Sequence, residues 1–212
     1  MIKAVISDFG GVLTTPLAGS YEAFADRTGL SMAELGGALG AIVAREGAHP
    51  LYEMECGRLS EAEFLAGLER AMHRQVGREI SCEGFAETLW SSLAPNEPMI
   101  SLMAELRDEG YRMALVTNNV REWESHWRAM APVDEIFELV VDSAFVGMRK
   151  PDPEIYALTL QSLQLPGEAC LFVDDLQRNC VAARAAGMQT VTYRDADQAI
   201  AEIRAALERA AA

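Results

Sequence analysis

From about residue 99 onward the chain alternates short apolar runs with amphipathic segments, and this alternation restricts the fold more than any other feature of the sequence. The apolar runs have the length of buried strands, and the segments between them repeat their apolar residues at helical spacing. Strands that alternate with helices predict a parallel, doubly wound α/β sheet with right-handed crossovers. The predicted strands are 111–116, 137–141, 169–173 and 189–193, and the predicted helices are 99–109, 122–130, 153–163, 179–186 and 199–210.

A further apolar run, residues 4–7, precedes Asp8 and two glycines and is predicted to be the first strand of the same sheet. Between this run and Pro95 we find no convincing strand. Capping boxes that begin at Ser31 and Ser60 instead predict helices there, and a further helix is predicted to begin at Ser81. We therefore expect an α/β core domain made of residues 1–16 and 95–212, interrupted by an all-helical cap domain, residues 17–94, hinged over the end of the first strand.

The composition excludes several classes of function. A net charge of −14 argues against binding to nucleic acid or to an anionic membrane by bulk electrostatics. No apolar run approaches the roughly 18–20 residues that a membrane helix needs. Four scattered cysteines and three histidines predict neither a zinc site nor a disulfide framework. The first strand leaves no room for a signal peptide, so we expect a cytoplasmic protein with reduced thiols, either a monomer or a homodimer.

Polar residues follow three of the predicted strands at their carboxyl ends, which meet at one edge of a parallel sheet. These residues are Asp8, the run Thr117-Asn118-Asn119, and the pair Asp174-Asp175. Adjacent buried carboxylates repel each other unless a cation is present. Oxygen ligands without a cluster of histidines or cysteines favour a hard cation, best Mg²⁺.

Lys150 lies in a loop that leads into a predicted helix, and it completes a set of groups suited to phosphoryl transfer. A carboxylate can act as the nucleophile, a divalent cation and a lysine can neutralise charge, and the Thr117 hydroxyl can donate to phosphoryl oxygens. Lys150 alone is typical of a solvated surface lysine, and Thr117-Asn118 alone of a plain turn. Their joint order in the chain is what favours a site.

The chain resembles the haloacid dehalogenase (HAD) superfamily, in its small helical-cap branch, over essentially its whole length. The segments that carry the resemblance match the four motifs of that family in order: 8–13, 116–119, 147–153 and 172–175. The style of these motifs is similar to that of bacterial sugar-phosphate phosphatases and of the phosphatase-like domain of soluble epoxide hydrolases. The resemblance implies a Rossmann-like core and a phosphatase, with a small phosphorylated metabolite as its substrate.

The resemblance also implies roles for individual residues. Asp8 is expected to attack phosphorus and to form an aspartyl-phosphate, which water then hydrolyses. Mg²⁺ is expected to be held by the Asp8 carboxylate, the main-chain carbonyl of Gly10 and Asp175, with Asp174 behind them orienting a bound water or Lys150. Phosphoryl oxygens are expected to bind to Lys150, the Thr117 hydroxyl and the backbone N–H of Asn118.

One position departs from the family pattern. Most phosphatases of this family have a second aspartate, the general acid and base, two residues after the nucleophile, where this chain has Gly10. A general acid or base contributes roughly 10²–10⁴-fold to the rate. Two alternatives therefore stay open: a phosphometabolite-binding protein of weak catalytic power, and a metal-independent 2-haloacid dehalogenase, against which the paired carboxylates argue.

Residues 46–59 break the helical periodicity of the cap, and we expect this segment to be a loop that determines substrate choice. Five of its side chains are candidates to reach the leaving group, with His49 as a substitute acid: His49, Tyr52, Glu53, Glu55 and Arg58. Trp123 and Trp127 are expected to pack in the core. Arg121 is a candidate for substrate contact or for the surface.

Overall fold

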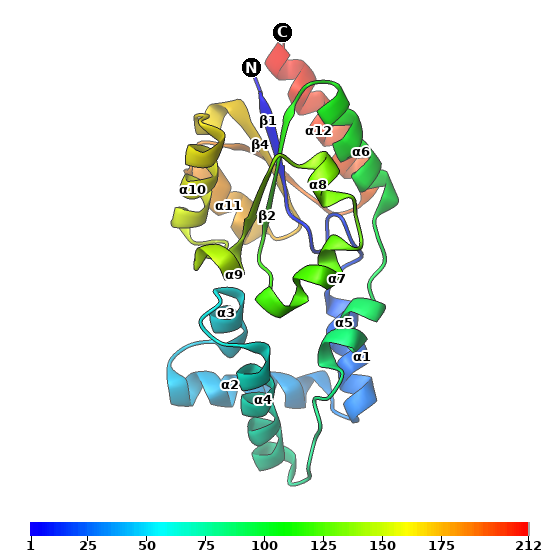
Figure 1. Ribbon diagram of the computed structural model, residues 1–212, viewed down its shortest axis with the longest axis vertical. Coiled ribbons are helices and arrows are strands. Elements are labelled where there is room, and N and C mark those ends of the chain that lie inside the picture. Colours follow the sequence, from blue (N-terminus) through cyan, green and yellow to red (C-terminus); the bar gives the residue numbers. More distant parts are fainter. Residues whose placement is uncertain (212) are drawn as a thin grey trace.

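Parallel strands form a five-stranded sheet, in the order β3-β2-β1-β4-β5, in the computed structural model of the chain, which describes residues 1–211 (Figure 1). The strands are β1 (Ala4–Ser7), β2 (Arg112–Thr117), β3 (Leu139–Asp142), β4 (Cys170–Asp174) and β5 (Gln189–Thr192). The predicted doubly wound parallel sheet is confirmed. Its central strand is β1, so the end of β1 lies between the ends of β2 and β4.

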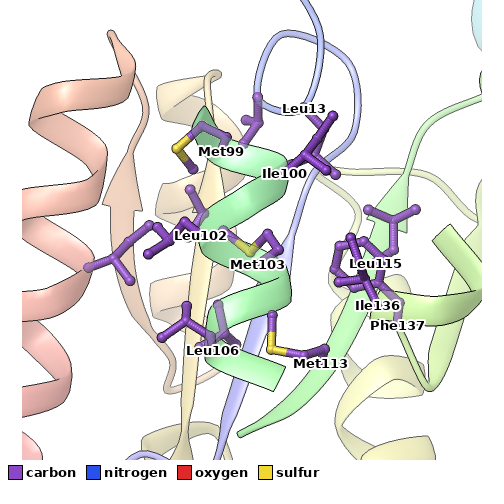
Figure 2. Packing of buried hydrophobic residues seen from close by; sticks show 14 of the residues in the cluster. Leu13, Met99, Ile100, Leu102, Met103, Leu106, Met113, Leu115, Ile136 and Phe137 are labelled. Atoms are coloured by element: carbon purple, nitrogen blue, oxygen red, sulfur yellow. The ribbon is translucent and has the colours of Figure 1, made fainter. Parts of the chain in front are cut away.

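Each face of the sheet is buried under helices. Successive side chains of a strand point to opposite faces, so neighbouring residues of one strand belong to different hydrophobic clusters. On β2, Met113 and Leu115 belong to one hydrophobic cluster, whereas Ala114 and Val116 belong to the other. Helices α6 (Glu97–Asp108) and α12 (Ala196–Ala211) cover the first face. Figure 2 shows the apolar side of α6 packed beside β2. Helices α10 (Pro153–Leu163) and α11 (Gln177–Ala185) cover the second face.

Short helical segments make up the remaining connections of the sheet unit. They are η1 (Arg121–Trp123), α7 (Glu124–Arg128), α8 (Val133–Ile136), α9 (Ser143–Val146) and η2 (Gly167–Ala169). The single helix predicted for residues 122–130 is therefore divided into η1 and α7. Trp123 and Trp127 are both buried, but Trp127 packs with the sheet unit and Trp123 with the helices of the insertion.

The inserted segment folds into helices that pack around a hydrophobic cluster of their own, and we call α1–α5 the helical unit. These helices are α1 (Ala18–Thr28), α2 (Met32–Glu46), α3 (Pro50–Glu55), α4 (Glu61–Val76) and α5 (Phe85–Ser91). Figure 1 shows the helical unit beyond the carboxyl ends of β1 and β2. Within residues 1–211, no helix is both long and apolar enough to span a membrane.

The two chain segments that connect the sheet unit with the helical unit lie side by side. Thr14 and Pro95 form an antiparallel bridge. The Thr15 N–H donates to the Ala94 carbonyl at 2.9 Å, and the Asn96 N–H donates to the Leu13 carbonyl at 2.9 Å. The two connecting segments are thus hydrogen-bonded to each other, which suits the predicted hinge. The domain boundaries at 16/17 and 94/95 stay a prediction.

Three predicted boundaries are wrong, each for a local reason. Residues 46–59 are not all loop, because they contain α3, which begins at Pro50, a residue suited to the first position of a helix. This helix is too short to show a helical period in the sequence. The helix predicted from Ser81 begins at Phe85. Gly84, just before it, has a left-handed backbone conformation (φ 67°), which cannot be part of a right-handed α-helix. The last helix starts at Ala196 rather than 199, where the Asp195 carboxylate accepts from the Gln198 N–H at 2.9 Å.

Candidate active site

The side chain of Lys150 lies at the centre of the polar groups that the strands bring together. Its Nζ is 2.7 Å from Asp8 Oδ1 and 2.8 Å from Asp174 Oδ2, and only 1% of the side chain is exposed. Burial lowers the pKa of Lys150, but the carboxylates of Asp174 and Asp8 more than compensate and hold the pKa above its usual value. Lys150 is therefore a fixed cation between the ends of β1 and β4, and not the solvated lysine that its sequence position alone suggests.

Asp8 follows β1 directly and lies 7% exposed at the edge of the sheet. The Phe9 N–H donates to Asp8 Oδ1 at 2.6 Å, and Lys150 contacts the same oxygen. Oδ2 is therefore the oxygen that these two groups leave for a further partner. Burial raises the pKa of Asp8; Lys150 opposes this shift, and the charges of Asp174 and Asp175 reinforce it. A cation beside Asp8 favours its ionised, nucleophilic form.

Asp174, the last residue of β4, is fully buried and its oxygens are occupied. Oδ1 accepts from the Leu176 N–H and from Asn179 Nδ2, both at 2.9 Å, while Oδ2 accepts from Lys150. The Leu176 contact is local and follows from the turn into α11. Asp174 thus fixes Lys150 from behind, and it has little capacity left for another ligand.

Asp175 is the third carboxylate of the cluster, and ligand atoms of Asp8, Asp174 and Asp175 all lie within 4.8 Å of one another. Burial, followed by the charge of Asp174, raises the pKa of Asp175 against the opposing effect of Lys150. The backbone of Gly11 (φ 81°) passes so close that an added Cβ would lie 2.7 Å from Asp175 Oδ2. Only glycine permits this approach.

The donor set of this cluster fits a hard divalent cation such as Mg²⁺. It consists of carboxylate oxygens, and two of the three carboxyl groups have raised pKa values that a positive charge would reverse. In addition, Oδ1 of the buried Asn179 has no hydrogen-bond partner within residues 1–211. A buried amide oxygen without a donor is suited to a water molecule bound to such a cation.

Asn118 makes a contact that the sequence analysis did not foresee. Its side-chain Oδ1 accepts from the Lys150 N–H at 2.8 Å, and its Nδ2 donates to the Lys150 carbonyl at 2.9 Å. The side chain thereby fixes the backbone on which Lys150 stands and leaves the backbone N–H of Asn118 available at the sheet edge. Thr117, at the end of β2, is buried.

A cavity of about 510 Å³ opens between the two units directly above the cluster. Asp8, Gly10, Asn118, Lys150 and Asp175 line its floor. Thr117 lines a smaller recess of about 40 Å³ that shares Gly10 and Asn118 with the cavity. The predicted site residues therefore line this cavity, except Asp174, which belongs to the carboxylate cluster but lies behind Lys150, and Thr117, which lines the adjoining recess.

Gly10 faces a side chain of the helical unit's entry segment. A Cβ at Gly10 would lie 3.0 Å from Leu17 Cδ1. Leu17 thus occupies the space into which a side chain at position 10 would extend, and no carboxylate stands there.

Of the five candidates in residues 46–59, His49, Tyr52 and Glu55 line the cavity. Glu53 and Arg58 pair with each other at 2.8 Å and are not among the residues that line it. Arg121 donates to the Ala144 carbonyl at 2.7 Å and likewise does not line the cavity. The helix α3, which the sequence did not predict, is what carries Tyr52 and Glu55 to this position.

Glu55 connects the helical unit with the sheet unit through Arg149. Arg149 Nε donates to Glu55 Oε2 at 2.7 Å, and its guanidinium lies 3.8 Å from the centre of the Tyr52 ring. Burial raises the pKa of Glu55, although Arg149 opposes this shift. Burial lowers the pKa of His49, and Arg149 adds to that effect. The two shifts therefore have opposite signs: burial favours the protonated form of Glu55 and the neutral form of His49.

Sequence reasoning missed several residues that line the cavity: Leu17, Tyr21, Arg149, Arg178 and Asn179. Arg149 and Asn179 lie within or just after recognised motifs, and that position was the available signal. The others are separated from the strand ends along the chain, and no local pattern marks them.

Comparison with known proteins places these features in context. A family model described as haloacid dehalogenase-like hydrolase matches residues 2–187. The sesquiterpene phosphatase astK of Aspergillus oryzae is 28% identical over 217 residues, with 95% of each chain covered. Bifunctional epoxide hydrolase 2 of Rattus norvegicus is 34% identical over 113 residues, which span 51% of this chain but only 20% of the rat protein.

Among solved structures, a HAD family enzyme from Bacteroides thetaiotaomicron, in complex with magnesium and inorganic phosphate, superimposes with a TM-score of 0.69. It is 25% identical in sequence, and the match covers 92% of this chain and 95% of that one. The same arrangement of sheet and inserted helices thus occurs in a protein that binds both Mg²⁺ and phosphate.

Proposed function

This chain belongs to the haloacid dehalogenase-like hydrolases, and we propose that it is a Mg²⁺-dependent phosphatase of a small phosphorylated substrate. The observation that carries the proposal is the buried Lys150, held between Asp8 and Asp174 beside a cluster of three carboxylates. This combination supplies a nucleophile, a fixed positive charge and ligands for a hard cation at one point. The related phosphatase astK and the magnesium- and phosphate-bound structure support the same assignment.

The reaction proceeds in two displacements at phosphorus. Asp8 attacks the phosphoryl group, the ester P–O bond breaks, and the leaving oxygen takes up a proton. Water then attacks the aspartyl-phosphate, the bond between phosphorus and Asp8 breaks, and inorganic phosphate leaves with the carboxylate restored. Because Phe9 N–H and Lys150 hold Oδ1, Asp8 needs no reorientation before it attacks.

Asp8, Asp175 and the Gly10 carbonyl would hold the Mg²⁺, which supplies charge neutralisation for the phosphoryl oxygens when bound. Asp174 is better suited to positioning, because its oxygens already accept from Lys150, Leu176 and Asn179. Lys150, the Thr117 hydroxyl and the Asn118 N–H are the proposed phosphate contacts. The Asn118 side chain keeps Lys150 in register by its paired contacts with the Lys150 backbone.

We assign the proton donor missing at Gly10 to Glu55. This carboxyl group lines both the cavity and its recess, and burial raises its pKa. A carboxylic acid with a raised pKa is a suitable donor to a leaving oxygen. For His49, which the sequence favoured for this role, burial and the charge of Arg149 lower the pKa and so disfavour the protonated form.

The test is hydrolysis of p-nitrophenyl phosphate with Mg²⁺ and with EDTA, in the natural chain and in Asp8→Asn. We expect metal-dependent turnover that Asp8→Asn lowers roughly 10⁴–10⁶-fold, the range for loss of a nucleophile. Asp108→Asn is the matched control, because Asp108 pairs with Arg107 on the surface.

Two results would replace the proposal by the alternatives that the sequence left open. Metal-independent release of halide from 2-chloropropionate would identify a dehalogenase. Binding of inorganic phosphate without turnover of any ester would identify a binding protein, the reading that Gly10 favours. Small phosphorylated partners and a cytoplasmic location remain part of the proposal.

A further inference from the structure

We infer that the phosphorylated substrate carries an apolar organic group, which the helical unit encloses, rather than a sugar. This inference rests on the proposed phosphatase function, because it takes the carboxylate cluster as the place of the phosphoryl group. The organic group of a bound ester must then extend from Asp8 and Lys150 into the cavity above them.

The wall of the cavity differs from its floor in chemistry. Its floor consists of carboxylates, an amide and Lys150, with the guanidinium groups of Arg149 and Arg178 at the side. The opposite wall carries, beside Tyr21 and the other residues at and near α3, five aliphatic or thioether side chains: Leu17, Met32, Leu35, Leu39 and Leu51. A sugar needs hydrogen-bond partners around its ring, and these five side chains supply none.

The carboxylate of α3 that lines the cavity, Glu55, is already paired. Arg149 pairs with Glu55 and lies over the Tyr52 ring, and Tyr52 stacks on His49 with ring centres 4.3 Å apart. This stack presents aromatic surface to the cavity. It adds apolar contact area to the wall, and within residues 1–211 His49 Nδ1 is its one buried nitrogen without a hydrogen-bond partner.

The cavity mouth gives an independent indication. Within residues 1–211, six large hydrophobic side chains are exposed, and three of them border this cavity: Met32 at 47%, Tyr52 at 37% and Leu176 at 39%. Exposed apolar side chains that gather at one opening mark a binding site, whereas scattered ones carry no meaning. Here they come from α2, α3 and the turn before α11, so they surround the opening.

A recess at the base of the cavity continues the apolar surface. Its apolar lining consists of Phe9, Leu89, Trp90, Leu93 and Trp123, together with Leu17, Tyr21 and Leu51, which it shares with the cavity; Glu55, Thr117 and Asn118 are among its polar lining residues. The recess is small, about 40 Å³, so it suits the narrow part of a hydrocarbon group next to the ester oxygen. The main cavity, at about 510 Å³, lies in the range of sites for drug-sized ligands, about 300–1,000 Å³.

The first test compares alkyl phosphates of increasing length with glucose 6-phosphate and glycerol 3-phosphate. We expect kcat/KM to rise about fourfold per methylene from ethyl to n-octyl phosphate, the increase expected from burial of each methylene. The two polar esters are expected at or below the rate of ethyl phosphate. A flat series, or a preference for glucose 6-phosphate with Mg²⁺-dependent turnover intact, overturns the inference and leaves the phosphatase assignment standing.

Equilibrium binding to Asp8→Asn, measured by calorimetry with n-octyl and ethyl phosphate, tests the same inference without turnover. Tighter binding of the octyl ester supports an apolar site even if no ester is hydrolysed, in which case the proposed function alone fails. Equal affinities, or no binding of either ester, overturn the inference.

Two glycines of α2 provide a matched pair of variants. An added Cβ at Gly36 or Gly40 meets no atom within 4 Å, but only Gly36 lines the cavity among the described residues. Leucine at either position also favours the helix, so both variants should fold. Gly36→Leu is expected to lower kcat/KM for n-octyl phosphate at least tenfold more than for ethyl phosphate, whereas Gly40→Leu changes neither. Equal effects of the two variants would contradict the placement of the organic group.

Discussion

The floor and the wall of the cavity are held together by different forces. On the floor, Lys150 is almost completely buried and is hydrogen-bonded to Asn118 and to Asp174 behind it, so its position is fixed by the ends of β2 and β4. The wall consists of α1–α3, whose side chains pack mainly by apolar contact around a cluster separate from that of the sheet. The Glu55–Arg149 pair and the Glu55 carbonyl, which accepts from the Ser143 hydroxyl at 2.6 Å, join the two regions.

This difference separates two tasks. Buried polar networks must be satisfied completely and tolerate little change, which suits the groups that meet the phosphoryl oxygens. Apolar packing tolerates substitution when the volume is conserved, which suits a surface that selects the organic group. If this division is correct, changes on the floor should affect every ester alike, and changes on the wall should depend on the ester.

Glu55→Gln tests this division most directly, because Glu55 lies in the wall but is proposed to donate a proton to the leaving oxygen. We expect kcat for n-octyl phosphate to fall roughly 10²–10⁴-fold, the contribution of a general acid. The effect on p-nitrophenyl phosphate should be much smaller, since p-nitrophenolate leaves without a proton. Steady-state kinetics with the two esters measures the difference.

If Glu55 has a purely structural role, Glu55→Gln would lower both rates equally, and that result would contradict its role as the proton donor. His49→Gln serves as the control within the same segment and is expected to change the two rates alike. The complementary variant Gly10→Asp with Leu17→Ala makes room for a carboxylate at position 10. It should restore part of the alkyl phosphate activity of Glu55→Gln.

Gly11→Ala tests the floor. An alanine Cβ would lie 2.7 Å from Asp175 Oδ2 and would have to adopt a φ of 81°, so Asp175 must move away from the cluster. We expect the Mg²⁺ concentration for half-maximal activity to rise about 10–100-fold, as for other disturbances of metal ligands. A titration of activity against Mg²⁺, with any one ester, measures this shift.

Gly10→Ala is the matched control for that experiment. Its Cβ would meet the flexible side chain of Leu17, with Cδ1 at 3.0 Å and Cγ at 3.5 Å. Its Mg²⁺ dependence should stay close to that of the natural chain. If both variants raised the Mg²⁺ concentration for half-maximal activity equally, the close approach of Gly11 to Asp175 would not be what Mg²⁺ binding requires.

Asp142→Asn has the smallest expected effect. It measures how much a buried carboxylate without a neighbouring lysine lowers the free energy of unfolding. Asp142 ends β3; its Oδ1 accepts from the Ala144 N–H at 2.9 Å, but Oδ2 has no partner within residues 1–211. Burial raises the pKa of Asp142 to about 6. The folded state therefore keeps its proton up to a higher pH than the unfolded state, so this group stabilises the fold less as pH rises from about 4 to about 6.

The natural chain should accordingly lose about 1 kcal/mol of unfolding free energy between pH 5 and pH 7 through this residue, and Asp142→Asn should not. Urea denaturation of both proteins at the two pH values gives the difference, from which the other titrating groups cancel. An identical pH dependence in the two proteins would mean that Asp142 is ionised throughout.

How much of the site could be predicted follows from where its residues lie along the chain. Asp8, Asp175 and Lys150 lie at strand ends or beside a helix start, so the topology of a parallel sheet was enough to bring them together. The pairing of the Asn118 side chain with the Lys150 backbone was not predictable, because it depends on how two loops face each other. The same holds for α3, whose six residues are too few to show a helical period.

The sequence by itself determined the parallel sheet, the helical insertion and the carboxylate cluster, since hydrophobic periodicity and strand ends are local properties of the chain. Only the tertiary structure decided that Leu17 fills the space beside Gly10, that Glu55 rather than His49 has the raised pKa, and that leucines line the wall. Each of these facts depends on burial and on contacts between segments distant in the chain. Burial of a carboxyl group and the shape of a cavity are set by the surroundings of a residue, and a sequence pattern does not contain them.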